Sequence, residues 1–244
     1  MFFVAEVSIH EKGDTAVSLS ERERAEIRQR FLALDTAIVC DVFDEKEWPM
    51  TALATNIQRV TYKPVKVAGW AYTIEGQFTV AKGPDRLKLQ IADQLPVDSV
   101  TVWAGTNAEG ICLFGDLIAG TMARRGCRGA VVDGGVRDVE AISRELEDFP
   151  VFSRYRTPVQ SIGRWRVTRH DVPIYMPGAL GGWVAVSPND FVLGDGDGVV
   201  VIPQERVMEV LERAEEIVRQ EAEARQLSAE GLSAEEMLEK YGHV

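Results

Sequence analysis

Apolar residues recur at helical spacing in several parts of the chain. Ser20 followed by Glu23 has the pattern of a capped helix start, and the apolar positions after it give that helix one buried face. A long amphipathic helix is predicted over 204–226, where apolar residues again fall on one face. Shorter helices are predicted over 36–43, 86–94, 117–125, 139–146 and 233–241.

Short apolar runs bounded by turn residues predict strands between these helices. The strongest are 66–74, 99–103 and 130–133, and residues 191–203 read as two strands joined by a tight Gly/Asp turn. Further short strands are predicted over 57–60, 151–153, 164–167 and 184–186. Because helices and strands alternate throughout, we expect one α/β domain over 1–244. An irregular arm (1–19), the helical residues 20–56 and a tail (227–244) would decorate it.

Composition and charge narrow the class of protein. The 244 residues are 45% hydrophobic, which suits a well-packed core, and the formal charge of −11 disfavours nucleic-acid binding. Arg124, Arg125 and Arg128 form the densest basic cluster, which we expect at a solvated helix end. The start of the chain is too short and too soon acidic for a signal peptide, and apolar runs fall short of the ~20 residues that span a bilayer. We therefore expect a cytoplasmic protein that is not bound to a membrane.

Cysteine and histidine usage excludes two further classes of site. The cysteines Cys40, Cys112 and Cys127 are odd in number and far apart, so we expect buried free thiols rather than disulfides or a zinc cluster. The three histidines are equally scattered, which disfavours a histidine-rich metal site.

The first half of the candidate site is the run Gly115, Asp116, Leu117 and Ile118. We expect Gly115 to allow a tight turn just before a helix. The amides that follow would be the free donors of a helix N-terminus, a common binding site for carboxylates. Because the chain carries a net negative charge, it needs a local group of donors of this kind to bind an acidic substrate. Taken alone, Asp116 is more often a helix cap.

The second half follows the predicted strand at 130–133. We expect Gly134 and Gly135 to make a sharp turn that presents Arg137 and Asp138 together. Arginine offers a forked donor for carboxylate or enolate oxygens, and aspartate is a hard oxygen ligand for magnesium or manganese. Taken alone, Arg137–Asp138 is more often a surface ion pair, and Asp133 before two glycines is more often a turn former.

The combination of Asp116 with Arg137–Asp138 resembles the regulator of ribonuclease activity A family, which includes class II aldolases acting on 4-hydroxy-4-methyl-2-oxoglutarate. The resemblance covers the core of the chain, about 32–218. Within this core it includes the segments 36–41, 69–73 and 195–203. It implies a swivelling β/β/α-type fold in trimers or hexamers, with sites between subunits. A tight hairpin turn explains Asp195 and Asp197 better than a metal site does.

The resemblance also implies roles for the candidate residues. Gly115 to Ile118 would bind the carboxylate of a small 2-oxo acid, Arg137 its oxygens, and Asp138 a divalent cation, Mg²⁺ or Mn²⁺. Asp116 would order a water near the reacting carbon. The reaction would be a lyase step that releases pyruvate, with oxaloacetate decarboxylation as a side activity. A neighbouring subunit would add an acidic residue, for which Glu212, Glu215 and Glu216 are candidates.

The sequence leaves other mechanisms and functions open. The stretch 115–138 holds no lysine, which disfavours a Schiff-base mechanism, although Lys82 and Lys88 remain open as participants. The family also contains non-catalytic proteins that bind and inhibit other proteins. A different metal-dependent hydrolase or decarboxylase on the same scaffold is the third reading.

Overall fold

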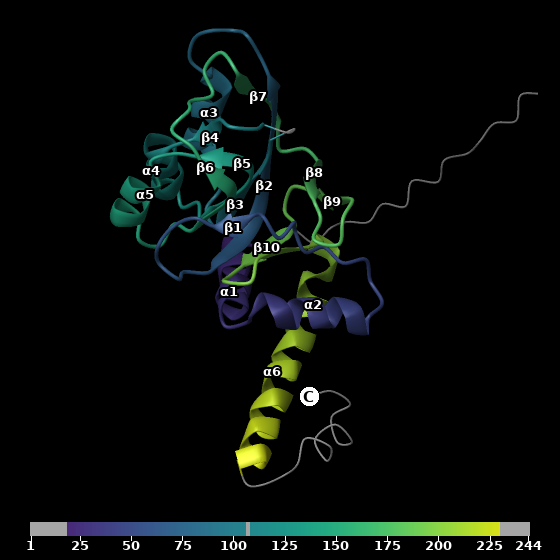
Figure 1. The fold of residues 1–244 in the computed structure, drawn as a ribbon. Coiled ribbons are helices and arrows are strands. Elements are labelled where there is room, and N and C mark those ends of the chain that lie inside the picture. The colour runs from purple at the N-terminus through teal and green to yellow at the C-terminus, as the bar shows by residue number, and fades with distance from the viewer. Residues whose placement is uncertain (1–18, 106–107, 230–244) are drawn as a thin grey trace, which may run out of the picture.

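The structure is a computed structural model that describes residues 19–105 and 108–229. Within these residues, nine strands form one sheet and two form a separate hairpin (Figure 1). The main path of the sheet runs β1-β6-β5-β3-β2-β10-β11, with β4 on β5 and β7 on β2. The strand bounds are β1 Gln58–Arg59, β2 Val67–Phe78, β3 Ser99–Ala104, β4 Cys112–Phe114, β5 Ala130–Val136, β6 Val151–Arg156, β7 Trp165–His170, β8 Ile174–Pro177, β9 Trp183–Val186, β10 Phe191–Gly194 and β11 Val199–Ile202.

The centre of the sheet is parallel, and its strands are covered on both faces. β2, β3, β5 and β6 pair in parallel, and every residue of β3 and β5 is buried. This burial explains why these strands read as continuous apolar runs rather than as alternating patterns.

The helices gather in two groups at opposite ends of the sheet (Figure 1). One group, α3, α4 and α5, packs with β3, β4 and β5 around one hydrophobic core. The other group, α1, α2 and α6, packs on β10 and β11 around a second core, and the C-terminal part of α6 projects away from the body. The bounds are α1 Glu21–Leu32, α2 Thr36–Glu45, α3 Arg86–Gln94, α4 Asp116–Arg124, α5 Val139–Glu145 and α6 Val207–Ala229, with a 3₁₀ turn at Gln204–Arg206.

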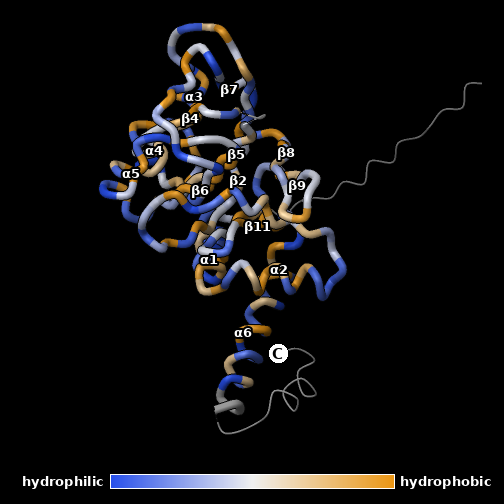
Figure 2. Tube along the Cα trace, viewed as in Figure 1, coloured by the Kyte–Doolittle hydropathy of each residue, from blue (hydrophilic) through white to orange (hydrophobic). Residues whose placement is uncertain are grey.

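The predicted α/β class, with helices before the sheet and a C-terminal helix, is confirmed, as are the helix and hairpin positions. Figure 2 shows hydrophobic and hydrophilic residues interleaved along the helices, which is the pattern that predicted them. The capping box forms: Glu23 N donates to Ser20 Oγ at 3.3 Å, and Ser20 N donates to Glu23 Oε2 at 2.8 Å. The strands β4 and β8 were not predicted. The predicted helix 233–241 and residues 1–18 of the predicted arm lie outside the described residues.

The predicted turn at Gly134–Gly135 is wrong. Both residues lie inside β5, where a Cβ on Gly135 would approach Ile111 O to 2.6 Å and Tyr155 Cε2 to 2.4 Å. The glycines therefore serve close packing between strands. Asp133 is likewise a buried strand residue, not a turn former, and pairs with Arg154.

Two further expectations from the sequence concern the cysteines and membrane-spanning segments. The described cysteines are free thiols, with Cys112 and Cys127 buried and Cys40 partly so. Within the described residues, helices are too short or too polar to cross a membrane.

The Gly/Asp turn between β10 and β11 anchors the start of α2. Asp195 accepts hydrogen bonds from Thr36 N and Thr36 Oγ1, both at 2.8 Å, and from Asp197 N at 3.0 Å. Burial raises the pKa of Asp195, but the hydrogen bonds from Thr36 and Asp197 outweigh burial and hold the pKa below its ordinary value. The turn is thus structural, as the sequence indicated.

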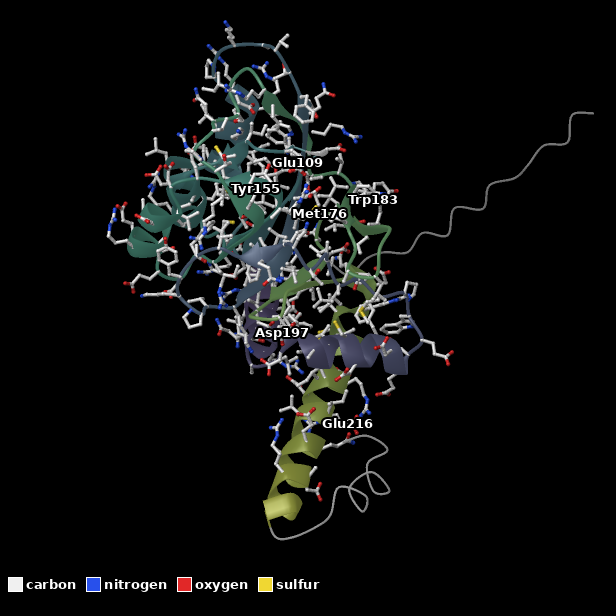
Figure 3. The ribbon with its side chains drawn as sticks, viewed as in Figure 1. Glu109, Tyr155, Met176, Trp183, Asp197 and Glu216 are labelled. Carbon is white, nitrogen blue, oxygen red and sulfur yellow. The ribbon has the colours of Figure 1, made fainter. Side chains whose placement is uncertain are left out.

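Replacing Asp195 with alanine should lower the free energy of unfolding by about 2–3 kcal/mol, because two buried donors lose a charged acceptor. The depressed pKa means that this stabilisation is present above about pH 4 and is lost as the pH falls further, so the difference from wild type should shrink in acid. Urea unfolding at pH 7 and pH 3.5 measures both effects. Asp197→Ala is the control, since that neighbouring side chain is exposed (Figure 3). Equal losses in the two variants would contradict the anchoring role.

Candidate functional site

Parallel pairing of β4 with β5 brings the two halves of the predicted site together. Cys112 lies opposite Gly135, and Phe114 lies opposite Val136. The carboxyl ends of parallel strands share one edge of a sheet, so the residues that follow them become neighbours. Arg137 N donates to Phe114 O at 3.3 Å, which fixes that proximity.

Gly115 touches the Arg137–Asp138 pair directly. A Cβ at Gly115 would lie 2.3 Å from Asp138 Oδ2 and 3.0 Å from Arg137 Nε. The backbone of Gly115 is extended, with φ −141°, a conformation open to any residue. The expectation that Gly115 serves a tight turn is therefore wrong: its missing side chain is what lets the carboxylate lie against the start of α4.

Asp138 has an unusual backbone conformation, and its side chain does not cap the helix that follows it. Its φ of 57° is left-handed, and it occupies the N-cap of α5 without making a side-chain capping bond. Instead, Asp138 Oδ2 accepts from Arg137 Nε at 3.0 Å. About a third of the Asp138 side chain is exposed, so the carboxylate remains accessible to a ligand.

The N-terminus of α4 presents its first amides beside this pair. Gly115 is the N-cap, and Asp116, Leu117 and Ile118 form the first turn. Asp116 Oδ1 accepts from Leu117 N at 2.8 Å, so its carboxylate partly occupies the donors that an anionic ligand would use. The Leu117 side chain is 79% exposed, which leaves this turn open to a ligand or to another subunit.

A cavity of about 310 Å³ lies in front of Gly115 to Ile118 and Arg137. This volume suits a small organic acid. Asp138 lines the adjoining cavity on the other side of Arg137, of about 430 Å³. Arg137 lines both cavities, while Gly115 at the start of α4 contacts Asp138 directly.

The first cavity also contains a lysine outside the predicted stretch. Lys88 is 7% exposed, and its Nζ donates to Leu113 O at 2.5 Å and to Ser161 Oγ at 3.2 Å. Burial lowers the pKa of Lys88, while the nearby Asp85 carboxylate opposes that shift. A signal was present in the sequence: Lys88 shares a helix face with Ile91, Ala92 and Leu95, where an apolar residue is expected.

The residues of one chain fit part of a metal site. Asp138 supplies an accessible carboxylate, the ligand type that magnesium and manganese prefer. Within the described residues, however, no group of three or more His, Cys, Asp and Glu side chains could hold a metal ion. Water, substrate oxygens or another chain would have to complete the coordination.

The glutamates suggested as a shared ligand lie on α6. Figure 3 places Glu216 on the projecting part of that helix, well apart from α4 and α5. Glu215 pairs with Arg30, and Glu216 pairs with Arg213. Within one chain these side chains do not join the site, so any role for them depends on a neighbouring subunit.

Replacing Gly115 with alanine should cost about 1–3 kcal/mol of unfolding free energy, because the new methyl group must displace Asp138 or Arg137. Gly120→Ala in the same helix is the control. Its Cβ would be no closer than 3.4 Å to the flexible end of Arg124, so this change should stabilise the protein by about 0.5–1 kcal/mol. Chemical denaturation measures both values. A neutral Gly115→Ala variant would show that the close contact is not needed.

Comparisons with known proteins identify the family of this chain. The family model RraA-like (Aldolase/RraA) matches residues 36–201. A protein of Halalkalibacterium halodurans with the provisional name 4-hydroxy-4-methyl-2-oxoglutarate aldolase is 30% identical over 219 residues, which cover 88% of this chain and 94% of that protein.

Solved structures share the fold. A structure described as one of the novel cellulases from gut-associated microbes has 30% identity and a TM-score of 0.76, covering 85% of this chain and 90% of that one. RraAS2 of Streptomyces coelicolor, an unusual member of the RNase ES inhibitor RraA protein family, has 24% identity and a TM-score of 0.68, with 82% and 96% covered. The matched core and the full-length relative together show that this chain belongs to the RraA-like family, which includes aldolases and RraA proteins.

Proposed function

We propose that this protein is a divalent-metal-dependent lyase that cleaves a carbon–carbon bond in a small 2-oxo acid and releases pyruvate. The observation that carries the proposal is the meeting of three groups at one place: the N-terminus of α4, the Arg137 guanidinium and the Asp138 carboxylate. These supply an anion site, a charged donor and a hard cation ligand within contact of Gly115.

Each group has a role in such a reaction. The amides at Leu117 and Ile118 bind the substrate carboxylate, and Asp116 releases the Leu117 amide as it does so. Arg137 donates to the 2-oxo oxygen, where negative charge develops as the C3–C4 bond breaks. Asp116 holds a water that takes the proton from the C4 hydroxyl as this bond breaks and returns a proton to C3, which converts the enolate into pyruvate. The products are pyruvate and a second oxo compound.

Asp138 would hold the cation, Mg²⁺ or Mn²⁺, next to Arg137. When bound, such a cation would act as a Lewis acid that stabilises the developing negative charge. Loss of carbon dioxide from oxaloacetate develops the same charge at the same oxygen, so the arrangement of Arg137 and Asp138 also serves decarboxylation.

The main alternative is a non-catalytic regulator on the same scaffold. A regulator that acts by binding another protein has no use for a carboxylate and a guanidinium held against a helix N-terminus. The likeness to RraAS2, at 24% identity, concerns the fold alone. The same geometry could serve a hydrolase or another decarboxylase, which substrate tests separate.

Pyruvate release from oxaloacetate and from 4-hydroxy-4-methyl-2-oxoglutarate should depend on added Mg²⁺ or Mn²⁺ and stop with a chelator. Asp138→Ala should lower the rate by about 10²–10³-fold or more while the protein still folds, because the cation loses its carboxylate ligand. Asp148→Ala is the matched control, since that carboxylate is exposed just beyond α5. The proposal would be refuted if the wild type released no pyruvate from either substrate, or if Asp138→Ala kept full activity.

The protein should also assemble as a trimer or a multiple of three, with the active site between subunits. One chain offers the metal only Asp138 among the predicted ligands, and apolar side chains such as Leu117 and Trp183 are 79% and 65% exposed. Light scattering measures the mass directly, and activity per chain should fall on dilution below the dissociation range. A monomer with full activity would contradict a shared site.

A further inference from the structure

Lys88 is a buried cation in the wall of the 310 Å³ cavity. It lies on α3, whose other inward residues are apolar, and its ammonium lies 5.4 Å from the centre of the Trp165 ring. A lysine in such surroundings loses hydration, which has to be replaced by hydrogen bonds or by an anion.

The charge of Lys88 is only partly balanced by the protein. Its ammonium donates hydrogen bonds to neutral oxygens, Leu113 O and Ser161 Oγ. Asp85 approaches Nζ only to 3.8 Å, and both its oxygens are engaged elsewhere: Oδ1 accepts from Lys88 N at 3.3 Å, and Oδ2 accepts from Val167 N at 2.9 Å. Two of the three ammonium donors are used in this way, and among the described residues the third makes no hydrogen bond, although Asp85 lies within ion-pair distance.

Lys88 also lines the same cavity as the anion site on α4. Its acceptor Leu113 is two residues before Gly115, a span of at most about 7 Å of extended chain. The same cavity is lined by Gly115 to Ile118 with Arg137 and by Lys88, Gln160 and Ser161. A short diacid in this cavity can engage both groups of donors.

We propose that Lys88, with Ser161, binds a second negatively charged group at the far end of the substrate, so that the site selects 2-oxo diacids over 2-oxo monoacids. The proposal rests on the proposed function for the identity of the first anion, a 2-oxo acid carboxylate. In this arrangement Lys88 contacts substrate and determines specificity.

The test compares the equilibrium binding of two five-carbon probes, 2-oxoglutarate and 2-oxopentanoate, which differ by a terminal carboxylate in place of a methyl group. Calorimetry with the full-length protein and Mg²⁺ should show at least about tenfold tighter binding of the diacid, the usual effect of one charge-assisted hydrogen bond. Lys88→Met should remove that preference and leave monoacid binding unchanged. Lys82→Met is the control, since it removes the same charge from an exposed position outside the cavity.

A wild-type protein that binds both probes equally, or a folded Lys88→Met variant that keeps the preference, would overturn the proposal. If Lys88→Met does not fold, Ser161→Ala decides, because it removes one hydroxyl and should weaken diacid binding several-fold without affecting the monoacid. These readouts are independent of turnover. A retained diacid preference without metal-dependent pyruvate release would refute the lyase and leave the role of Lys88 standing.

Discussion

The close contact between β4 and β5 is the constraint on which the candidate site depends. Gly134 and Gly135 present no side chains there, and a Cβ on Gly134 would approach Leu113 Cδ1 to 2.7 Å. Larger residues would push β4 outward and take the start of α4 with it. Gly115 would then lose its contact with Asp138, and the amides of α4 would no longer face the same cavity as Arg137.

Local positive charge explains how a chain with a net charge of −11 can hold an acidic ligand. Arg137, Lys88 and the α4 N-terminus line one cavity together with Asp85 and Asp116, while most other acidic groups are on the solvated surface, where screening limits their reach. Because the cavity is partly shielded from water, charges that line it interact with a ligand more strongly than surface charges do. In the proposed role of Lys88, an anion that enters the cavity would offset the cost of burying the lysine charge.

The sequence predicted the elements well because local signals set them: the capping box at Ser20 and the apolar face of α6 need no knowledge of distant residues. The sequence-based prediction failed where contacts with a partner strand determine the local conformation. A Gly-Gly pair suits both a turn and a close strand contact, and only the position of Ile111 and Tyr155 separates the two. Three-residue β4 was too short to show a pattern. Lys88 remained open as a participant, but its distance from Arg137 in sequence gave no sign that the two line one cavity.

The position of Asp138 argues for a bound cation rather than for a structural carboxylate. Glycine or asparagine would accept its left-handed backbone equally well, so the conformation alone does not require an aspartate. The side chain makes no capping bond to α5. Its pair with Arg137 is more than a third exposed and so contributes at most about 1 kcal/mol. A negative charge that stabilises the fold so little, yet is held close to Gly115, fits the proposed role of Asp138 as a cation ligand.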